Sequence, residues 1–194
     1  MKFFIFLCVQ FLFGLHASAQ VKVNIIWTMQ TKMNANETIY YMANKKLIWA
    51  DFKGTPPAPS STQAITSSGF GYSADMKSTN GNGVINIKVY CFFNKTKSWV
   101  RPTGKTNYIL EHEQHHFDAT YLSAYGFMEK LKAATITIQN MDAVLSAIYK
   151  EANAARVKMQ DDYDTQTKNG ILKDKQAKWN NFFVEKLAEI SLLK

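Results

Sequence analysis

Three of the four histidines in this chain of 194 residues lie within five consecutive positions. His112, Glu113 and His116 form an H-E-x-x-H motif in a proline-free segment, from about 105 to 134, with apolar residues at helical spacings. On a helix, residues four apart lie about 40° apart around the axis and one turn along it. Two imidazoles placed in this way can bind one Zn²⁺ ion, and Glu113 can accept a proton from a water molecule that the ion activates. The motif therefore predicts zinc-dependent hydrolysis with Glu113 as the general base.

The third zinc ligand must come from outside this motif, because a hydrolytic zinc site has three protein ligands and one open position. His115 points about 60° away from His112 on a helix, so we expect it next to the site or at the surface rather than on the ion. The remaining histidine, His16, falls in the N-terminal segment described below. We therefore expect a carboxylate or a weaker ligand, and the acidic candidates downstream are Asp118, Glu129, Asp142, Glu151, Asp161, Asp162 and Asp164.

Helix geometry narrows these candidates. Asp118 lies about 160° around the helix from His116 and therefore faces away. If this helix and a second one at about 140–167 form an antiparallel hairpin, the motif lies roughly 20 residues before the turn and faces about residue 160. The acidic residues at that height are Asp161, Asp162 and Asp164. The alternative interpretation of this cluster is a solvent-exposed acidic helix end.

The N-terminus has the three parts of a secretory signal peptide. Lys2 precedes an apolar run at 3–15, and an A-S-A cleavage sequence ends at Ala19. The run is too short for a stable membrane anchor. We therefore expect residues 1–19 to be removed and the remainder to be exported to the periplasm or outside the cell.

The composition fits one globular domain at 20–194. Hydrophobic residues make up 46% of the chain and charged residues 20%, which are ordinary values for a folded protein. The net charge is +8, but the lysines are scattered along the chain. Together with the predicted export, this scatter argues against nucleic acid as a partner. We expect a peptide or protein substrate, and nothing in the sequence indicates an oligomeric state.

Residues 20–102 are predicted to be mainly β and residues 103–194 mainly α, which defines an α+β fold. We expect an antiparallel sheet from alternating apolar residues at 21–25, an apolar run at 47–49 and a strand at 64–76. A turn at 80–83, with the sequence N-G-N-G, leads into a return strand. One face of that strand carries Ile85, Ile87, Val89, Cys91 and Phe93.

Three further expectations concern cysteine, helices and loops. Cys91 shares its face with large apolar residues, which favours a core position over a nucleophile. The helices are predicted at about 105–134, 140–167 and 174–193. The Pro/Ser loop at 54–61 is a candidate wall of the substrate cleft.

The chain resembles the DUF922 family of secreted bacterial proteins, which are described as predicted zinc-dependent proteases. The resemblance rests on the sequences W-A-D-F-K-G at 49–54, S-W-V at 98–100, L-E-H-E-Q-H-H-F-D at 110–118, Y-D-T-Q-T at 163–167 and W-N at 179–180. It implies a zincin-like domain in which His112 and His116 bind zinc and Glu113 is the base. It also implies Asp164 as the third ligand, although a regular helix would turn Asp162 closer to the apolar stripe.

One position departs from the pattern of the family. Many members have a histidine where this chain has Asn169. If that histidine completes the site in other members, this chain has a weakened zinc site. If Asp164 is the ligand, the replacement has little effect on zinc binding.

Two functions of different classes are consistent with these features. The first is a secreted zinc metallopeptidase, with Tyr163, Tyr121 and Arg101 as candidates to stabilise the oxyanion. A variant of it is zinc-dependent hydrolysis of another amide, such as a cell-wall peptide link. The second is an envelope protein that keeps the zincin scaffold without turnover and acts by binding, which Asn169 suggests. Zinc content measured together with peptidase activity distinguishes the two.

Overall fold

A computed structural model describes residues 21–58, 61–79 and 82–192. The predicted signal peptide at 1–19 lies outside this range, as does the centre of the predicted hairpin turn at 80–81. The described part has an α+β fold, in which strands in the N-terminal half are followed by three long helices. This confirms the predicted fold class. None of the helices in the described ranges is long and apolar enough to span a membrane.

The main sheet has four strands, and β5 (Asn82–Asn94) pairs with the other three. The strands β4 (Ser68–Thr79) and β2 (Thr38–Tyr40) pair with β5 in antiparallel fashion. In contrast, β1 (Val21–Trp27) runs parallel to β5, with Val21 opposite Gly83 and Trp27 opposite Val89. The predicted antiparallel sheet is therefore wrong for β1. Alternating apolar residues predict a strand, but they do not determine the direction of its partner.

Two short segments differ from the predicted strands. The predicted strand at 64–76 is interrupted after β3 (Ala64–Ile65), which pairs with β6 (Trp99–Val100), and the chain resumes as β4. The apolar run at 47–49 is not a strand, because it leads into the 3₁₀-helix η1 (Trp49–Asp51). Leu47 is nevertheless buried, and its N–H donates a hydrogen bond to Gln114 Oε1 at 2.8 Å. Its apolar character reflects core packing without sheet pairing.

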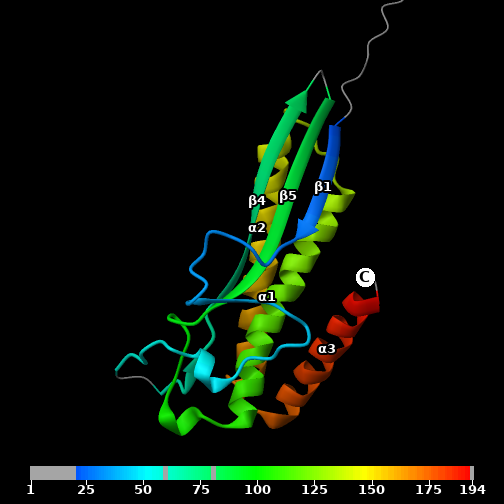
Figure 1. The fold of residues 1–194 in the computed structure, drawn as a ribbon. Coiled ribbons are helices and arrows are strands. Elements are labelled where there is room, and N and C mark those ends of the chain that lie inside the picture. Colours follow the sequence, from blue (N-terminus) through cyan, green and yellow to red (C-terminus); the bar gives the residue numbers. More distant parts are fainter. Residues whose placement is uncertain (1–20, 59–60, 80–81, 193–194) are drawn as a thin grey trace, which may run out of the picture.

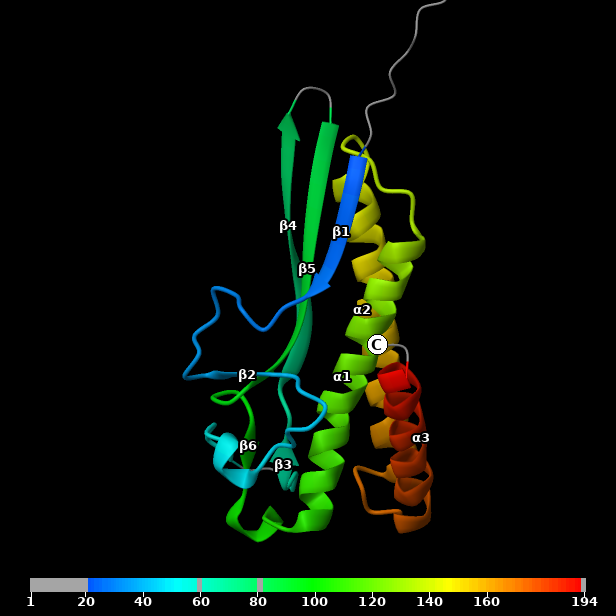
Figure 2. The same cartoon turned by 45° about the vertical axis from the view of Figure 1, so that its right-hand side comes forward.

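The three helices lie close to their predicted ranges. After the short 3₁₀-helix η2 (Pro102–Gly104), α1 spans Asn107–Ala133, α2 spans Met141–Thr167 and α3 spans Lys173–Leu192. Thr106 caps α1 by accepting a hydrogen bond from the Ile109 N–H at 3.2 Å. Figures 1 and 2 show α1 and α2 running side by side along one face of the long strands, with α3 beside their lower half.

The predicted core face of the return strand is confirmed. Its five side chains are fully buried: Ile85, Ile87, Val89, Cys91 and Phe93. Cys91 is thus a core residue, as predicted. This face packs against α1, where Phe93 contacts Phe117 with ring centroids 5.9 Å apart. The sheet therefore supports the helix that carries the H-E-x-x-H motif.

Candidate metal centre

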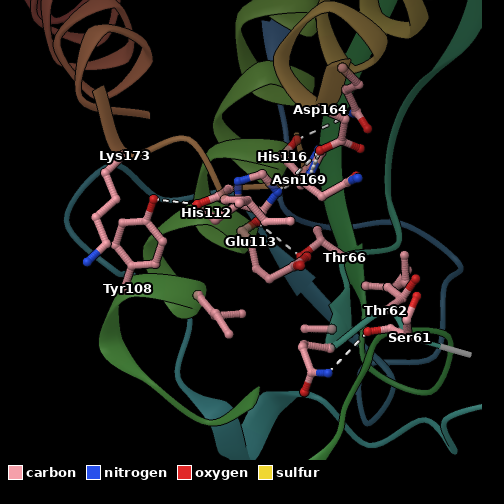
Figure 3. Close-up of a pocket in the computed structure, with 17 residues that line it drawn as sticks. Ser61, Thr62, Thr66, Tyr108, His112, Glu113, His116, Asp164, Asn169 and Lys173 are labelled. Atoms are coloured by element: carbon pink, nitrogen blue, oxygen red, sulfur yellow. Dashed lines mark hydrogen bonds and ion pairs between the residues drawn. The ribbon is translucent and has the colours of Figure 1, made fainter. Parts of the chain in front are cut away.

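Two helices bring together three metal-ligating side chains. His112 and His116 lie one turn apart on α1, and their Nε2 atoms are 3.3 Å apart. Oδ1 of Asp164, on α2, lies 3.2 Å from Nε2 of His112 and 3.1 Å from Nε2 of His116. All three atoms lie within 4.8 Å of one another, so the cluster could hold a metal ion. Figure 3 shows these residues converging beside a pocket.

The spacing of the three atoms fits a small transition-metal ion. In a tetrahedral zinc site with ligand distances of about 2.0–2.1 Å, neighbouring ligand atoms lie about 3.3 Å apart. Moreover, Oδ1 of Asp164 is buried, and its contacts at this distance are the two imidazole nitrogens, neither of which makes a well-aligned hydrogen bond to it in the described residues. A cation between the three atoms would satisfy this buried carboxylate oxygen. Two nitrogens and one oxygen are donors that suit zinc and related divalent ions.

The electrostatics of the cluster follow from the same proximity. Burial alone would raise the pKa of Asp164, but the two neighbouring histidines outweigh it and hold the pKa below its ordinary value. For His116, burial disfavours the protonated form, whereas Asp164 and Glu113 favour it, and the pKa is raised overall. The site therefore favours positive charge, as a cation-binding site should.

The other two acidic candidates lie elsewhere on α2. Asp161 is exposed, and Asp162 forms a salt bridge with Lys158 at 2.6 Å on the outer surface. Neither belongs to the metal-ligating cluster found among the described residues. The predicted height agrees with the structure, because Gln160 Nε2 lies 3.4 Å from the carbonyl oxygen of His116, to which it donates a hydrogen bond.

His112 is held in place by a residue that the sequence analysis missed. Gln176, in the first turns of α3, is 1% exposed, and its Oε1 lies 3.0 Å from Nδ1 of His112. Its Nε2 donates hydrogen bonds to Tyr163 Oη at 2.6 Å and to Asn180 Oδ1 at 2.7 Å. These two bonds fix the orientation of the Gln176 amide, so its oxygen accepts a hydrogen bond from Nδ1–H of His112. Nε2 of His112 then carries no proton and faces the cluster.

Tyr163 forms the second support of His112. Its ring stacks on the imidazole at a centroid distance of 4.6 Å, and its hydroxyl lies 3.4 Å from the carbonyl oxygen of His112. The hydroxyl is thus engaged inside the protein, and Tyr163 does not line the pocket. Burial raises the pKa of Tyr163, which keeps the phenol neutral.

Glu113 lies at the pocket beside the cluster. It is 4% exposed, and its Oε2 is buried without a hydrogen-bond partner among the described residues. The pocket has a volume of about 610 Å³ and is also lined by His112, His116 and Asp164. This volume lies within the usual range of small-molecule and peptide side-chain sites. A carboxylate oxygen without a partner, next to a candidate cation site and an open pocket, is placed to accept a proton from a reacting water molecule.

His115 and Asp118 form a separate buried network behind the site. His115 is buried rather than at the surface; its Nδ1 lies 2.9 Å from Oδ2 of Asp118, and its ring stacks on Phe183 of α3. Asp118 faces away from the cluster, as predicted, and accepts hydrogen bonds from Tyr41 Oη at 2.9 Å and Gln114 Nε2 at 2.8 Å. This network connects α1 to the N-terminal half of the chain.

The chain turns directly beneath the cluster after α2. Lys168, Asn169 and Gly170 all have left-handed backbone conformations, with φ of 49°, 52° and 81°. The Asn169 N–H donates a hydrogen bond to the Asp164 carbonyl oxygen at 2.8 Å, and Asn169 lines the pocket. A Cβ atom on Gly170 would lie 3.3 Å from Nδ1 of His112. Asn169 is therefore part of the pocket wall.

The other predicted site residues lie away from the pocket. Tyr121 is buried and stacks on Tyr41 at 4.0 Å, and Arg101 donates to the Thr62 carbonyl oxygen at 3.0 Å. Neither lines the pocket, so the structure does not support them as oxyanion donors. Of the Pro/Ser loop, Ser61 lines the pocket, while its described residues 54–58 do not.

No family model, curated protein or solved structure matches this chain. The resemblance to the DUF922 family therefore stays a prediction.

Proposed function

We propose that this protein is an exported zinc-dependent metallopeptidase. One observation carries the proposal: a His112–His116–Asp164 cluster with tetrahedral spacing lines the same pocket as Glu113, whose Oε2 has no hydrogen-bond partner among the described residues. Two histidines and a carboxylate leave one position of a tetrahedral zinc ion open to water or substrate. This is the ligand arrangement of a catalytic rather than a structural zinc site.

The chemistry divides between the ion and the protein. A bound zinc ion would supply a Lewis acid that polarises a carbonyl group and lowers the pKa of water. His112, His116 and Asp164 would hold the ion, and Gln176 keeps His112 in the tautomer that leaves its Nε2 free for this role. Oε2 of Glu113 accepts the proton of the attacking water, and the resulting carboxylic acid protonates the leaving amine. The net reaction is the addition of water across a peptide bond.

Export is proposed from the N-terminal sequence alone. The predicted signal peptide would release a chain that begins at Gln20, just before β1. Expression of the full-length chain in a bacterial host, followed by N-terminal sequencing of the exported product, tests this. A product that starts at Gln20 supports export, whereas retention of Met1 contradicts it.

The decisive experiment compares two glutamate variants on the same helix. Metal content and hydrolysis of a peptide library are measured for the wild-type protein, Glu113→Gln and Glu111→Gln. Glu111 is exposed and does not line the pocket, so it is a matched control. We expect Glu113→Gln to retain zinc and to lose about 10²- to 10⁴-fold in kcat/KM, while Glu111→Gln stays near wild type. Zinc retention with unchanged hydrolysis in Glu113→Gln would remove the assigned mechanism.

A second candidate function is binding without turnover, as an envelope protein that keeps a zincin scaffold. Asn169 favours it, because this residue lines the pocket where many family members have a histidine. It predicts weak metal occupancy and no cleavage of any peptide in the library. Efficient zinc-dependent hydrolysis would exclude it.

A further inference from the structure

The pocket beside the metal cluster has a distinctive charge on one wall. Among the described residues that line it, Lys173 is the one with a permanently charged basic side chain. Lys173 is exposed at the start of α3. Figure 3 shows its side chain extending past Tyr108, away from His112, so its ammonium group lies at the outer end of this wall and is not held by an ion pair among the described residues.

The charges of the pocket change sign when a divalent ion is present. The acidic residues that line it are Glu113 and Asp164. A divalent cation at the cluster would offset these two carboxylates. With the charge of Lys173 added, the pocket would then have a net positive charge. A pocket with low-dielectric walls strengthens the attraction of such a charge for an anion. The loaded site would therefore attract a carboxylate.

Lys173 also lies on a defined side of the cluster. Figure 3 shows Lys173 and Tyr108 on one side of His112, with Ser61 and Thr62 on the other. The Tyr108 hydroxyl donates a hydrogen bond to the Gly170 carbonyl oxygen at 2.5 Å, which fastens this wall to the turn beneath His112. One extended peptide residue spans about 3.3–3.6 Å, so a peptide across the cluster reaches this wall within a few residues.

We propose that Lys173 makes the pocket selective for peptides with a carboxylate on the α3 side of the scissile bond. This inference rests on the proposed function and adds a substrate class to it. The carboxylate can belong to an acidic side chain or to the C-terminus of the substrate, because both present the same group to the ammonium. The net charge of the full chain is +8, and it stays strongly positive when Lys2 is removed with the proposed signal peptide, which supports the encounter with acidic peptides.

The test uses zinc-loaded protein and peptides that differ at one position. Glu, Gln or Lys is placed in turn at each of three positions on either side of the bond, with both peptide ends blocked, and a second set has a free C-terminal carboxylate. We expect wild-type kcat/KM to be about three- to tenfold higher for Glu than for Gln on one side of the bond, and to fall with rising salt. Preference for an internal Glu identifies a side chain as the source, and preference for the free C-terminus identifies the terminal carboxylate.

Two lysine variants establish whether Lys173 is responsible. Lys173→Glu should reverse the order of the Glu and Lys peptides, whereas Lys175→Gln should keep the wild-type order, because Lys175 is exposed and outside the pocket. An equal change for all peptides in Lys173→Glu, or the same shift in Lys175→Gln, overturns the inference.

Binding separates this inference from the proposed function. Zinc-loaded Glu113→Gln is titrated with the same fluorescent peptides, and the Kd ratio of Glu to Gln peptides is measured with and without Lys173→Glu. Cleavage without a charge preference contradicts the inference and leaves the peptidase intact. Charge-selective binding without cleavage by the wild type contradicts the peptidase and supports the inference. If the protein shows no cleavage and no charge-selective binding, both the peptidase and the inference are contradicted.

Discussion

Asp164 is the residue that completes the candidate metal centre. Its Oδ1 is equidistant, within 0.1 Å, from two imidazole nitrogens at 3.1 and 3.2 Å, neither of which makes a well-aligned hydrogen bond to it in the described chain. Without an ion, the carboxylate and the two imidazoles stay together only where a histidine is protonated, as the raised pKa of His116 beside Asp164 favours. A cation would bind to all three atoms, and its attraction to the negative charge of Asp164 would contribute to the affinity. Removing that charge therefore tests the site directly.

We predict that Asp164→Asn weakens zinc binding by at least about tenfold, because a neutral amide is a poorer zinc ligand than a carboxylate. Affinity is measured by competition with a chromophoric chelator. Asp162→Asn, two residues earlier and paired with Lys158, is the control and should keep wild-type affinity. The opposite result, with Asp162→Asn weaker and Asp164→Asn unchanged, would assign the ligand to Asp162.

Gln176 acts on the metal through His112. We predict that Gln176→Ala lowers zinc affinity by about 10- to 100-fold, the usual effect of losing the partner of a ligating histidine. Gln166→Ala is a suitable control, because Gln166 is exposed and accepts a hydrogen bond from Trp179 at 3.1 Å, away from the pocket. Partial recovery in Gln176→Glu, which keeps an acceptor for His112 Nδ1, would distinguish positioning from a loss of packing. Equal zinc affinity in all four proteins would contradict the role.

At the scale of elements, the site depends on how α1, α2 and the turn after α2 fit together. The helix hairpin could be predicted from the sequence, because its height follows from residue counts and the rise of a helix. These counts predicted that the part of α2 near residue 160 lies opposite the H-E-x-x-H motif, and Gln160 does contact α1. Gln176 could not be predicted in this way. Its role depends on how α3 docks, which no spacing within one helix determines.

The same limit explains the differences in the sheet. Alternation located β1 and the buried face of β5, but the parallel pairing of β1 arises from the path of the whole N-terminal half. Leu47 was predicted to lie in a strand because it is apolar. In the structure it lies in a loop, and its side chain is buried in the core. Local sequence patterns thus predicted which residues are buried. They did not predict which strand or loop those residues pack against.

Two glycines on neighbouring elements should respond to alanine in opposite ways. Gly170 has φ of 81°, and an added Cβ would approach His112 Nδ1 to 3.3 Å. Gly126 lies within α1, and an added Cβ would meet nothing within 4 Å. We predict that Gly170→Ala lowers the free energy of unfolding by about 1–2 kcal/mol and also weakens zinc binding. Gly126→Ala should raise the free energy of unfolding by about 0.5–1 kcal/mol, because alanine favours a helix interior.

Urea unfolding of the zinc-free and zinc-loaded proteins checks this pair. Because Gly170→Ala acts on both folding and the metal site, its deficit should be larger in the zinc-loaded form. A deficit of the same size with and without zinc would show that the strain of the turn does not reach His112.

At the scale of the whole molecule, the ion would link parts of the chain that are distant in sequence. Its ligands come from α1 and α2, and the His112 support comes from α3. Zinc that binds the folded state alone stabilises it by RT ln(1 + [Zn]/Kd), which is about 2.7 kcal/mol at a hundredfold excess over Kd. Most of that gain should appear where the three helices meet, since the long strands β4 and β5 are held by their own ladder.

We predict that adding zinc to chelated protein raises Tm in a concentration-dependent manner. Hydrogen exchange should slow in the second half of α2, the turn at 168–172 and the start of α3, while exchange in β4 and β5 stays the same. His112→Ala is the control, because it removes a ligand and should abolish both effects. A zinc-dependent rise in Tm that persists in His112→Ala would place the stabilising ion elsewhere on the molecule. Uniform slowing across strands and helices in the wild type would instead mean that the chain responds to zinc as one cooperative unit.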